Sequence, residues 1–258
     1  MQFQFYKYQG TGNDFIIIDN RENKIELSAA QIKKLCNRKF GVGADGLMLL
    51  NTKQGYDFEM KYYNADGNES SMCGNGGRCM IKFAHAMGIH KSKYYFWAID
   101  GNHEATIELN GWVHLKMQNV NKLTINSEDA ILNTGSPHYV KPFSNVRNMD
   151  VVKEGKLIRY SNQFAKEGIN VNYVEAMENN IFVRTYERGV EDETLSCGTG
   201  VTAAALVFAH NDNGFNRVEI ETPGGNLAVE FCKTGSENFE NIWLCGPAEF
   251  VFKGEINI

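Results

Sequence analysis

Two nine-residue segments of this chain carry nearly the same pattern, and this repeat constrains the fold more than any other feature. Residues 71–79 read SMCGNGGRC, and residues 195–203 read LSCGTGVTA. In each segment a cysteine comes directly before Gly-x-Gly, and a stretch that can form a helix follows. The repeat therefore predicts two equivalent thiols, those of Cys73 and Cys197, at the N-termini of two helices.

This placement favours a reactive thiol beside a site that holds an anion. Free backbone N–H groups and the helix dipole lower the pKa of a thiol at a helix N-terminus. The glycines let the backbone approach a ligand closely and leave N–H groups to hold a carboxylate. Two such thiols suit inversion at an α-carbon, because one thiolate can remove the proton from one face while a thiol donates to the other. Their pKa values then belong to the pair.

The composition limits the classes of protein to which this chain can belong. The chain has 258 residues, 43% of them apolar and 22% charged, with a net charge of −5, which is ordinary for a soluble globular protein. No basic patch stands out, so we expect no nucleic-acid partner. The first residues do not read as a signal peptide, and no apolar run approaches the roughly 18 residues of a membrane span. We therefore expect a cytoplasmic protein with no membrane association and with its six cysteines reduced.

Short apolar or alternating runs predict many strands and few helices. The predicted strands are 15–18, 47–50, 58–63, 94–97, 106–109, 113–115, 169–174, 181–186, 218–221, 227–231, 242–244 and 250–252. The predicted helices are 28–35, which opens with a Ser28/Gln31 capping box, and the mostly apolar stretches 78–87 and 202–210. Asn110-Gly111 predicts a two-residue hairpin turn.

The order of these elements repeats once along the chain. A strand, a Cys-Gly-x-Gly loop, a helix and further strands occur before residue 115 and again after residue 170. We therefore predict an α/β (α+β) protein of two pseudo-symmetric domains, residues 1–117 and 118–248. One alternative places the last strand, residues 249–258, in the first domain.

Other interpretations of the cysteines were weighed against the paired-thiol hypothesis. Cys73 and Cys197 could be packed small hydrophobes, which is the interpretation preferred for the remaining four cysteines: Cys36, Cys79, Cys232 and Cys245. The spacing of Cys73 and Cys79 does not suit zinc, and no metal site is predicted. A redox switch that forms a Cys73–Cys197 disulfide, or a protein that only binds a ligand, are alternatives from other classes.

With these residues in view, the chain resembles diaminopimelate epimerase over essentially its whole length. The motifs that carry the resemblance are Gly10–Phe15, Gly41–Gly46, Tyr63–Gly67, Met72–Cys79, Gly135–His138, Gly168–Asn170, Tyr186–Gly189, Glu193–Gly200, Pro223–Gly225 and Gly246–Ala248. Proline racemase shares the two-thiol chemistry and is the alternative within the same class. The Gly-Asn-Asp-Phe start and the Tyr-Glu-Arg-Gly segment favour the epimerase.

The resemblance implies an activity and a fold. The family interconverts LL- and meso-diaminopimelate in the route to lysine and peptidoglycan, without pyridoxal phosphate or a metal. Each of its two domains is a curled, mostly antiparallel sheet around a central helix, with the site between the domains. The resemblance also implies a homodimer and a small-molecule substrate as the only other partner.

Site residues are carried over position by position. Cys73 and Cys197 match the catalytic cysteines, and His138 and Glu187 match polar residues that act beside them. The positions that match substrate contacts are Asn13, Asn64, Gly74, Asn75, Asn170, Glu187, Arg188, Gly198 and Thr199. From the residues alone, His138 could instead cap a loop, Asn64 could serve only as a turn residue, and Glu187 and Arg188 could form a solvated ion pair.

Two positions depart from the family pattern. Many members carry glutamine where this chain has Gly46, so that contact is lost or passes to water or backbone. Many have asparagine where this chain has Ser136. A serine hydroxyl is shorter and has fewer donors, so we do not expect Ser136 to bind the substrate directly; a water-mediated contact is the alternative.

Overall fold

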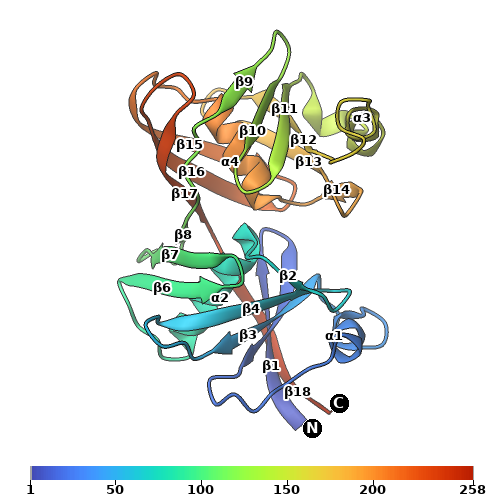
Figure 1. Ribbon diagram of the computed structural model, residues 1–258, viewed down its shortest axis with the longest axis vertical. Coiled ribbons are helices and arrows are strands. Elements are labelled where there is room, and N and C mark those ends of the chain that lie inside the picture. The colour runs from blue at the N-terminus through green and yellow to red at the C-terminus, as the bar shows by residue number, and fades with distance from the viewer. Residues whose placement is uncertain (1, 258) are drawn as a thin grey trace. The chain divides into compact units, whose positions relative to one another are not determined.

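The computed structural model describes residues 2–257, and the chain divides into two compact units (Figure 1). Unit 1 runs to Leu115 and resumes at Pro247, and unit 2 is Lys116–Gly246. The domain limits expected from the sequence, between residues 117 and 118 and between residues 248 and 249, remain a prediction.

The elements of unit 1 are strands β1 (Gln2–Gly10), β2 (Asn13–Asp19), β3 (Gly46–Asn51), β4 (Phe58–Asn64), β5 (Glu69–Ser70), β6 (Lys93–Ala98), β7 (Gly101–Ile107), β8 (Val113–Lys116, at the limit of the unit) and β18 (Glu249–Asn257), with helices α1 (Ala29–Cys36) and α2 (Gly74–Ala86). Those of unit 2 are β9 (Leu123–Ile125), β10 (Ala130–Asn133), β11 (Pro137–Pro142), β12 (Asn170–Ala176), β13 (Ile181–Glu187), β14 (Asp192–Thr194), β15 (Gly214–Thr222), β16 (Gly225–Lys233) and β17 (Phe239–Gly246), with the 3-10 turn η1 (Val146–Asn148) and helices α3 (Val151–Arg159) and α4 (Gly198–Val207).

The two units repeat one topology strand for strand. In unit 1, β2 pairs in parallel with β3, β3 pairs antiparallel with β4, and β4 pairs antiparallel with β5 and parallel with β6. In unit 2, β11 to β15 pair with the same directions in the same order. Helices α1 and α3 occupy equivalent crossovers, as do α2 and α4. This duplication confirms the predicted α+β class with two repeated domains.

Each unit has one helix enclosed by its sheet. Helix α2 contacts β1, β2, β3, β7 and β18, and helix α4 contacts β10 to β13 and β15 to β17. Helix α4, with the sequence GTGVTAAALV, is buried along nearly its whole length, which its small apolar side chains permit. Both central helices begin four residues earlier than predicted, at the glycine directly after the cysteine.

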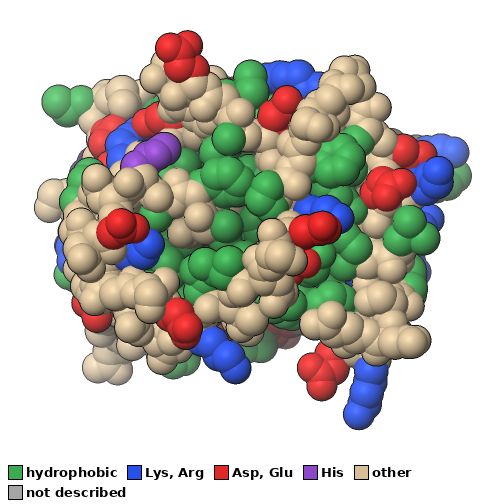
Figure 2. All heavy atoms as spheres, turned by 90° about the horizontal axis from the view of Figure 1, so that it is seen from above, with side chains coloured by type: hydrophobic (Ala, Val, Ile, Leu, Met, Phe, Trp, Pro, Cys, Tyr) green, Lys and Arg blue, Asp and Glu red, His purple; other side chains and the backbone are tan. Residues whose placement is uncertain are grey.

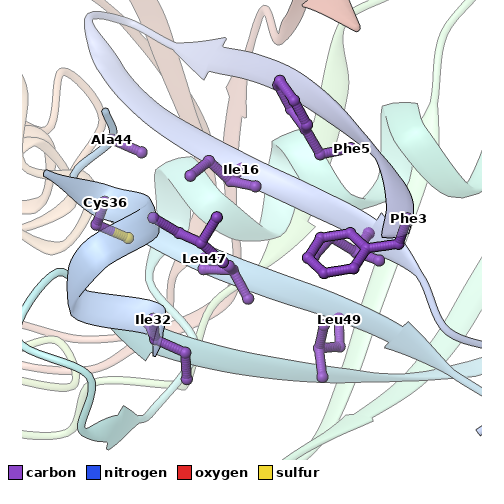
Figure 3. Close-up of a cluster of buried hydrophobic side chains, with 10 residues drawn as sticks. Phe3, Phe5, Ile16, Ile32, Cys36, Ala44, Leu47 and Leu49 are labelled. Carbon is purple, nitrogen blue, oxygen red and sulfur yellow. The ribbon is translucent and has the colours of Figure 1, made fainter. Parts of the chain in front are cut away.

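A hydrophobic core of unit 1 lies under α1, on the face of the sheet opposite to helix α2. Phe3, Phe5, Ile16, Leu47 and Leu49 belong to one cluster of buried side chains there (Figure 3). The remaining members from α1 and its flanking loop are Ile32, Leu35, Cys36 and Ala44. Because one face of the sheet meets α2 and the other meets α1, strand β3 is buried at every position. The capping box at Ser28 is present as predicted.

Three local predictions were wrong or incomplete. The connection at Asn110-Gly111 has three residues, since Glu108 N–H bonds Trp112 C=O and only Gly111 takes a positive φ. Helix α3 was not predicted, because its sequence VVKEGKLIR contains a central glycine. Cys232 is only partly buried, so core packing does not describe all four remaining cysteines.

Candidate active site

Cys73 is the N-cap residue of helix α2. Its backbone is extended, and the N–H of Gly76 donates to its Sγ at 3.2 Å. A thiolate accepts such a bond better than a thiol does, so the helix terminus stabilises the anionic form. A Cβ added at Gly76 would stand 3.1 Å from this sulfur and 3.4 Å from Met48 Sδ, so glycine keeps the space around Cys73 open.

The turn between β1 and β2 brings Asn13 and Asn75 beside Cys73. Thr11 and Gly12 both have positive φ, as a tight two-residue hairpin requires, and a β-branched residue rarely adopts that conformation. The buried Arg78 guanidinium donates to Thr11 Oγ1 and to Asn75 Oδ1, both at 3.1 Å. Asn75 Nδ2 lies 3.5 Å from Asn13 Oδ1, which is 4.0 Å from Cys73 Sγ. The structure thus joins three predicted site residues.

Asp45 determines which way the Asn13 amide faces. Asn13 Nδ2 donates to Asp45 Oδ2 at 2.6 Å, which leaves Asn13 Oδ1 toward Cys73 and Asn75. Asn13 therefore presents an acceptor at the site, suited to an ammonium or thiol donor and not to a carboxylate.

Asp45 belongs to a charged network at the surface of unit 1. Arg38 Nη2 lies 2.7 Å from both Asp45 and Asp14, and Lys7 Nζ lies 2.7 Å from Asp14. Burial alone would raise the pKa of Asp14, but hydrogen bonds from Arg38 and Lys7 outweigh it and hold that pKa far below its usual range. Asp14 is therefore an anion throughout the physiological range.

Cys197 occupies the equivalent position in unit 2. It is the N-cap residue of α4 and is buried, and its Sγ is 3.5 Å from Thr199 Oγ1. Thr134 Oγ1 donates to the Thr199 carbonyl at 2.9 Å and ties this first turn, which Gly198 opens, to the loop after β10. The N-terminus of a helix favours anions in general, and in α2 the Gly76 N–H already donates to Cys73 Sγ.

A second polar cluster in unit 2 joins Asn170, Arg188 and Ser136. Asn170 Nδ2 donates to Ser136 Oγ at 2.9 Å, and its Oδ1 accepts the Arg188 N–H at 2.9 Å. Arg188 Nη2 lies 3.3 Å from Ser136 Oγ and Nη1 is 3.0 Å from the Glu167 carbonyl. Ser136 thus contacts two predicted substrate ligands and holds them together, while Arg188 is an exposed residue.

His138 is fully buried on β11. Burial first, and the charge of Arg188 second, lower its pKa to about 3. Asn172 Nδ2 lies 3.1 Å from His138 Nδ1. His138 is therefore uncharged at neutral pH.

Two further predicted residues, Glu187 and Asn64, lie at the ends of strands. Glu187, at the end of β13, accepts a hydrogen bond from Thr194 Oγ1 at 2.9 Å. Asn64 is exposed at the end of β4, opposite Gly46 in the strand register. A Cβ at Gly46 would lie 2.5 Å from the Tyr62 ring, so Tyr62 fills the space that a side chain at position 46 needs.

Sequence reasoning missed two residues that hold the site together, Asp45 and Asn172. Asp45 stands inside a glycine motif that was noted only for its resemblance. Asn172 follows Asn170 by two positions, and strand alternation therefore places both on one face of β12. That periodicity is the signal that could have found it.

Figure 2 shows charges of both signs interspersed around apolar side chains on one face. In the described residues, no helix is both long and apolar enough to cross a membrane. A hollow of about 710 Å³ beside β1 and the loop after β2 contains none of the candidate residues.

Comparison with known proteins identifies relatives over the whole chain. The family model described as diaminopimelate epimerase matches residues 5–123 and 130–251. A diaminopimelate epimerase of Flavobacterium psychrophilum is 52% identical over 98% of this chain and all of that protein. One from Chlorobaculum tepidum is 40% identical over 96% of this chain and 99% of that protein.

Solved structures share the fold at low sequence identity. A Bacillus anthracis protein of the PhzF phenazine biosynthesis family matches all of both chains with a TM-score of 0.77 and 14% identity. A hydroxyproline epimerase from Agrobacterium vitis covers 99% of this chain and 92% of that one, with a TM-score of 0.69 and 12% identity. These likenesses support the fold alone.

Proposed function

Because the chain belongs to the diaminopimelate epimerase family, we propose that it interconverts LL- and meso-diaminopimelate, a step toward lysine and peptidoglycan precursors. The observation that carries this proposal is the pair of cysteines at the N-caps of two equivalent helices, in a chain that matches the family over nearly its full length. A protein that only binds its ligand does not need two equivalent thiols.

The reaction uses one thiolate and one thiol and no cofactor. One sulfur, of Cys73 or Cys197, takes the α-proton while the other donates a proton to the opposite face. The first-turn N–H groups, including those of Gly74, Asn75, Gly198 and Thr199, hold the reacting carboxylate and stabilise the charge that develops next to it.

The other end of the substrate is a second amino acid, and it needs its own ligands. The exposed Arg188 guanidinium can take a carboxylate in bidentate fashion, and Asn170, held by Ser136, fixes the backbone of Arg188. Asn13 and Asn64 supply amide groups, and Glu187 accepts from an ammonium. A substrate without a second charged end, such as proline, leaves Arg188 without a counter-ion.

Solvent deuterium incorporation tests the proposed reaction. Reduced protein without added pyridoxal phosphate is mixed with LL-diaminopimelate in D₂O and followed by NMR. We expect label at one α-carbon and formation of the meso isomer. We expect Cys73→Ala and Cys197→Ala each to abolish epimerisation, and Cys232→Ala, a partly buried thiol outside the repeat, to retain it. Full activity in either repeat variant rules out the two-thiol mechanism.

We further propose that the protein is a cytoplasmic homodimer, as the family resemblance implies. Light scattering coupled to size exclusion tests the assembly, because a dimer has twice the chain mass of 29.1 kDa. A single species at the mass of one chain contradicts the dimer but leaves the proposed reaction intact.

A further inference from the structure

The buried imidazole of His138 has one nitrogen with a partner and one without. Its Nδ1 lies 3.1 Å from Asn172 Nδ2. Its Nε2 is buried and has no hydrogen-bond partner within residues 2–257. Buried polar atoms in native proteins nearly always have a partner, so this nitrogen is a candidate for a hydrogen bond to a ligand.

The hydrogen bonds of Asn172 leave only one orientation for its amide. Its Nδ2 is 3.0 Å from the Tyr139 carbonyl oxygen, which can only accept. Its Oδ1 is 2.9 Å from Thr185 Oγ1, which can donate. If the amide were reversed, two carbonyl oxygens would face each other. The NH₂ group therefore points to Tyr139 and His138.

This orientation decides the tautomer of His138. Because Asn172 donates to Nδ1, that nitrogen must carry the lone pair, and in the neutral ring the proton resides on Nε2. We propose that Asn172 is a positioning residue that holds His138 as the Nε2–H tautomer, so that His138 serves the site as a hydrogen-bond donor and not as a base.

The Asn172 amide lies against the first turn of α4. A Cβ added at Gly200 would overlap Asn172 Oδ1 and would stand 3.2 Å from Cys197 Cβ. The absence of a side chain at Gly200 thus lets the Cys197 helix approach the amide that orients His138. The Nε2–H group suits an anionic acceptor that is present when the substrate is bound, either a carboxylate or a thiolate. This role rests on the proposed epimerase function, whereas the tautomer does not.

Nitrogen NMR of the wild-type protein tests the tautomer directly. The six histidines are labelled with ¹⁵N, and two-bond ¹H–¹⁵N correlations separate Nε2–H rings, Nδ1–H rings and imidazolium. The His138→Gln variant identifies the His138 signal. We expect an Nε2–H ring that does not titrate between pH 5 and 9. An Nδ1–H ring, or titration near the ordinary histidine pKa of about 6.5, overturns the proposal.

Replacing Asn172 by aspartate reverses the hydrogen bond. A carboxylate can only accept, so Nδ1 must gain a proton, and the ring becomes Nδ1–H or imidazolium. We expect the kcat of the epimerase reaction to fall on the order of 10²-fold, as for the loss of one oriented donor, with a smaller change in KM. An Asn172→Asp variant that keeps an Nε2–H ring and wild-type kcat refutes the positioning role.

Asn216→Asp is the matched control. Asn216 is also a buried strand asparagine of unit 2, and within residues 2–257 its amide bonds Asn211 and Gly214. We expect it to lose stability without changing the His138 spectrum. If Asn172→Asp does not fold, the wild-type spectrum still decides the tautomer. A wild-type protein with the Nε2–H ring but no epimerase activity refutes the proposed function and not the tautomer.

Discussion

Replacing Asp45 by alanine should weaken substrate binding without removing any proposed substrate ligand. Asp45 accepts from Asn13 Nδ2 at 2.6 Å and from the Asp14 N–H at 3.2 Å. Without the carboxylate, the Asn13 amide can turn its NH₂ group toward the site and lose the acceptor that an ammonium requires.

The structure sets the size of the effect. A hydrogen bond to a charged acceptor contributes about 1.5–3 kcal/mol. The Asp45 side chain is 43% exposed and solvent weakens the interaction, so we take a value just below that range, about 1.4 kcal/mol, which corresponds to a tenfold change in binding. We therefore expect KM for LL-diaminopimelate to rise roughly tenfold, with kcat changed much less. Initial rates of meso product formation across a substrate series measure both constants.

Two further variants distinguish the effect of Asn13 orientation on KM from the effect of surface charge. Asp45→Asn keeps an acceptor oxygen and should recover most of the wild-type KM. Arg38→Met removes the ion pair to Asp45 but leaves the Asp45–Asn13 bond, and the Arg38 side chain is 59% exposed, so KM should stay within about twofold. An Asp45→Ala variant with wild-type KM, or an equal rise in Arg38→Met, refutes the reasoning.

Two predictions concern stability. Gly200→Ala places a methyl group against Asn172 Oδ1 and should lower the free energy of unfolding, measured in urea, by about 1–3 kcal/mol. Gly235→Ala is the control, because its Cβ meets mainly the flexible Asn238 side chain, and it should change that free energy by less than about 0.5 kcal/mol. Because the folded-state pKa of Asp14 is depressed, its stabilisation is complete above the unfolded pKa of about 3.9 and is lost as the pH falls below it. The unfolding free energies of wild type and Asp14→Asn should therefore differ at pH 7 and converge in acid; a constant difference would show that Asp14 contributes no proton-linked stability.

Much of the fold was predictable because its signals are local. Apolar runs such as 15–18 and 47–50 mark strands that are covered on both faces, and both were found. The helix starts were placed late because glycine-rich turns read as loops. Burial by the surrounding strands overrides this weak propensity and extends both helices back to the cysteines.

The site residues also separate into those with a local signal in the sequence and those whose role depends on tertiary contacts. Asn13, Cys73 and Asn75 were predicted individually, but the orientation of Asn13 depends on Asp45, which is 32 residues away in the chain. Ser136 was not expected to bind the substrate directly, and that stays a prediction; its hydrogen bonds to Asn170 and Arg188 come from the structure alone. A change of residue type is visible in a sequence, but its hydrogen-bond partners are not.

The sequence by itself determined where the two thiols stand, since a cysteine before Gly-x-Gly and an apolar helix leads to an N-cap position through local backbone geometry. Only the tertiary structure decided how the neighbouring amides and the imidazole face. Asn172 meets His138 across a parallel strand pair and Thr185 across an antiparallel one, at sequence separations of 34 and 13 residues. Hydrogen-bond direction at such a site follows from which donors and acceptors the sheet brings into contact, and that depends on strand register.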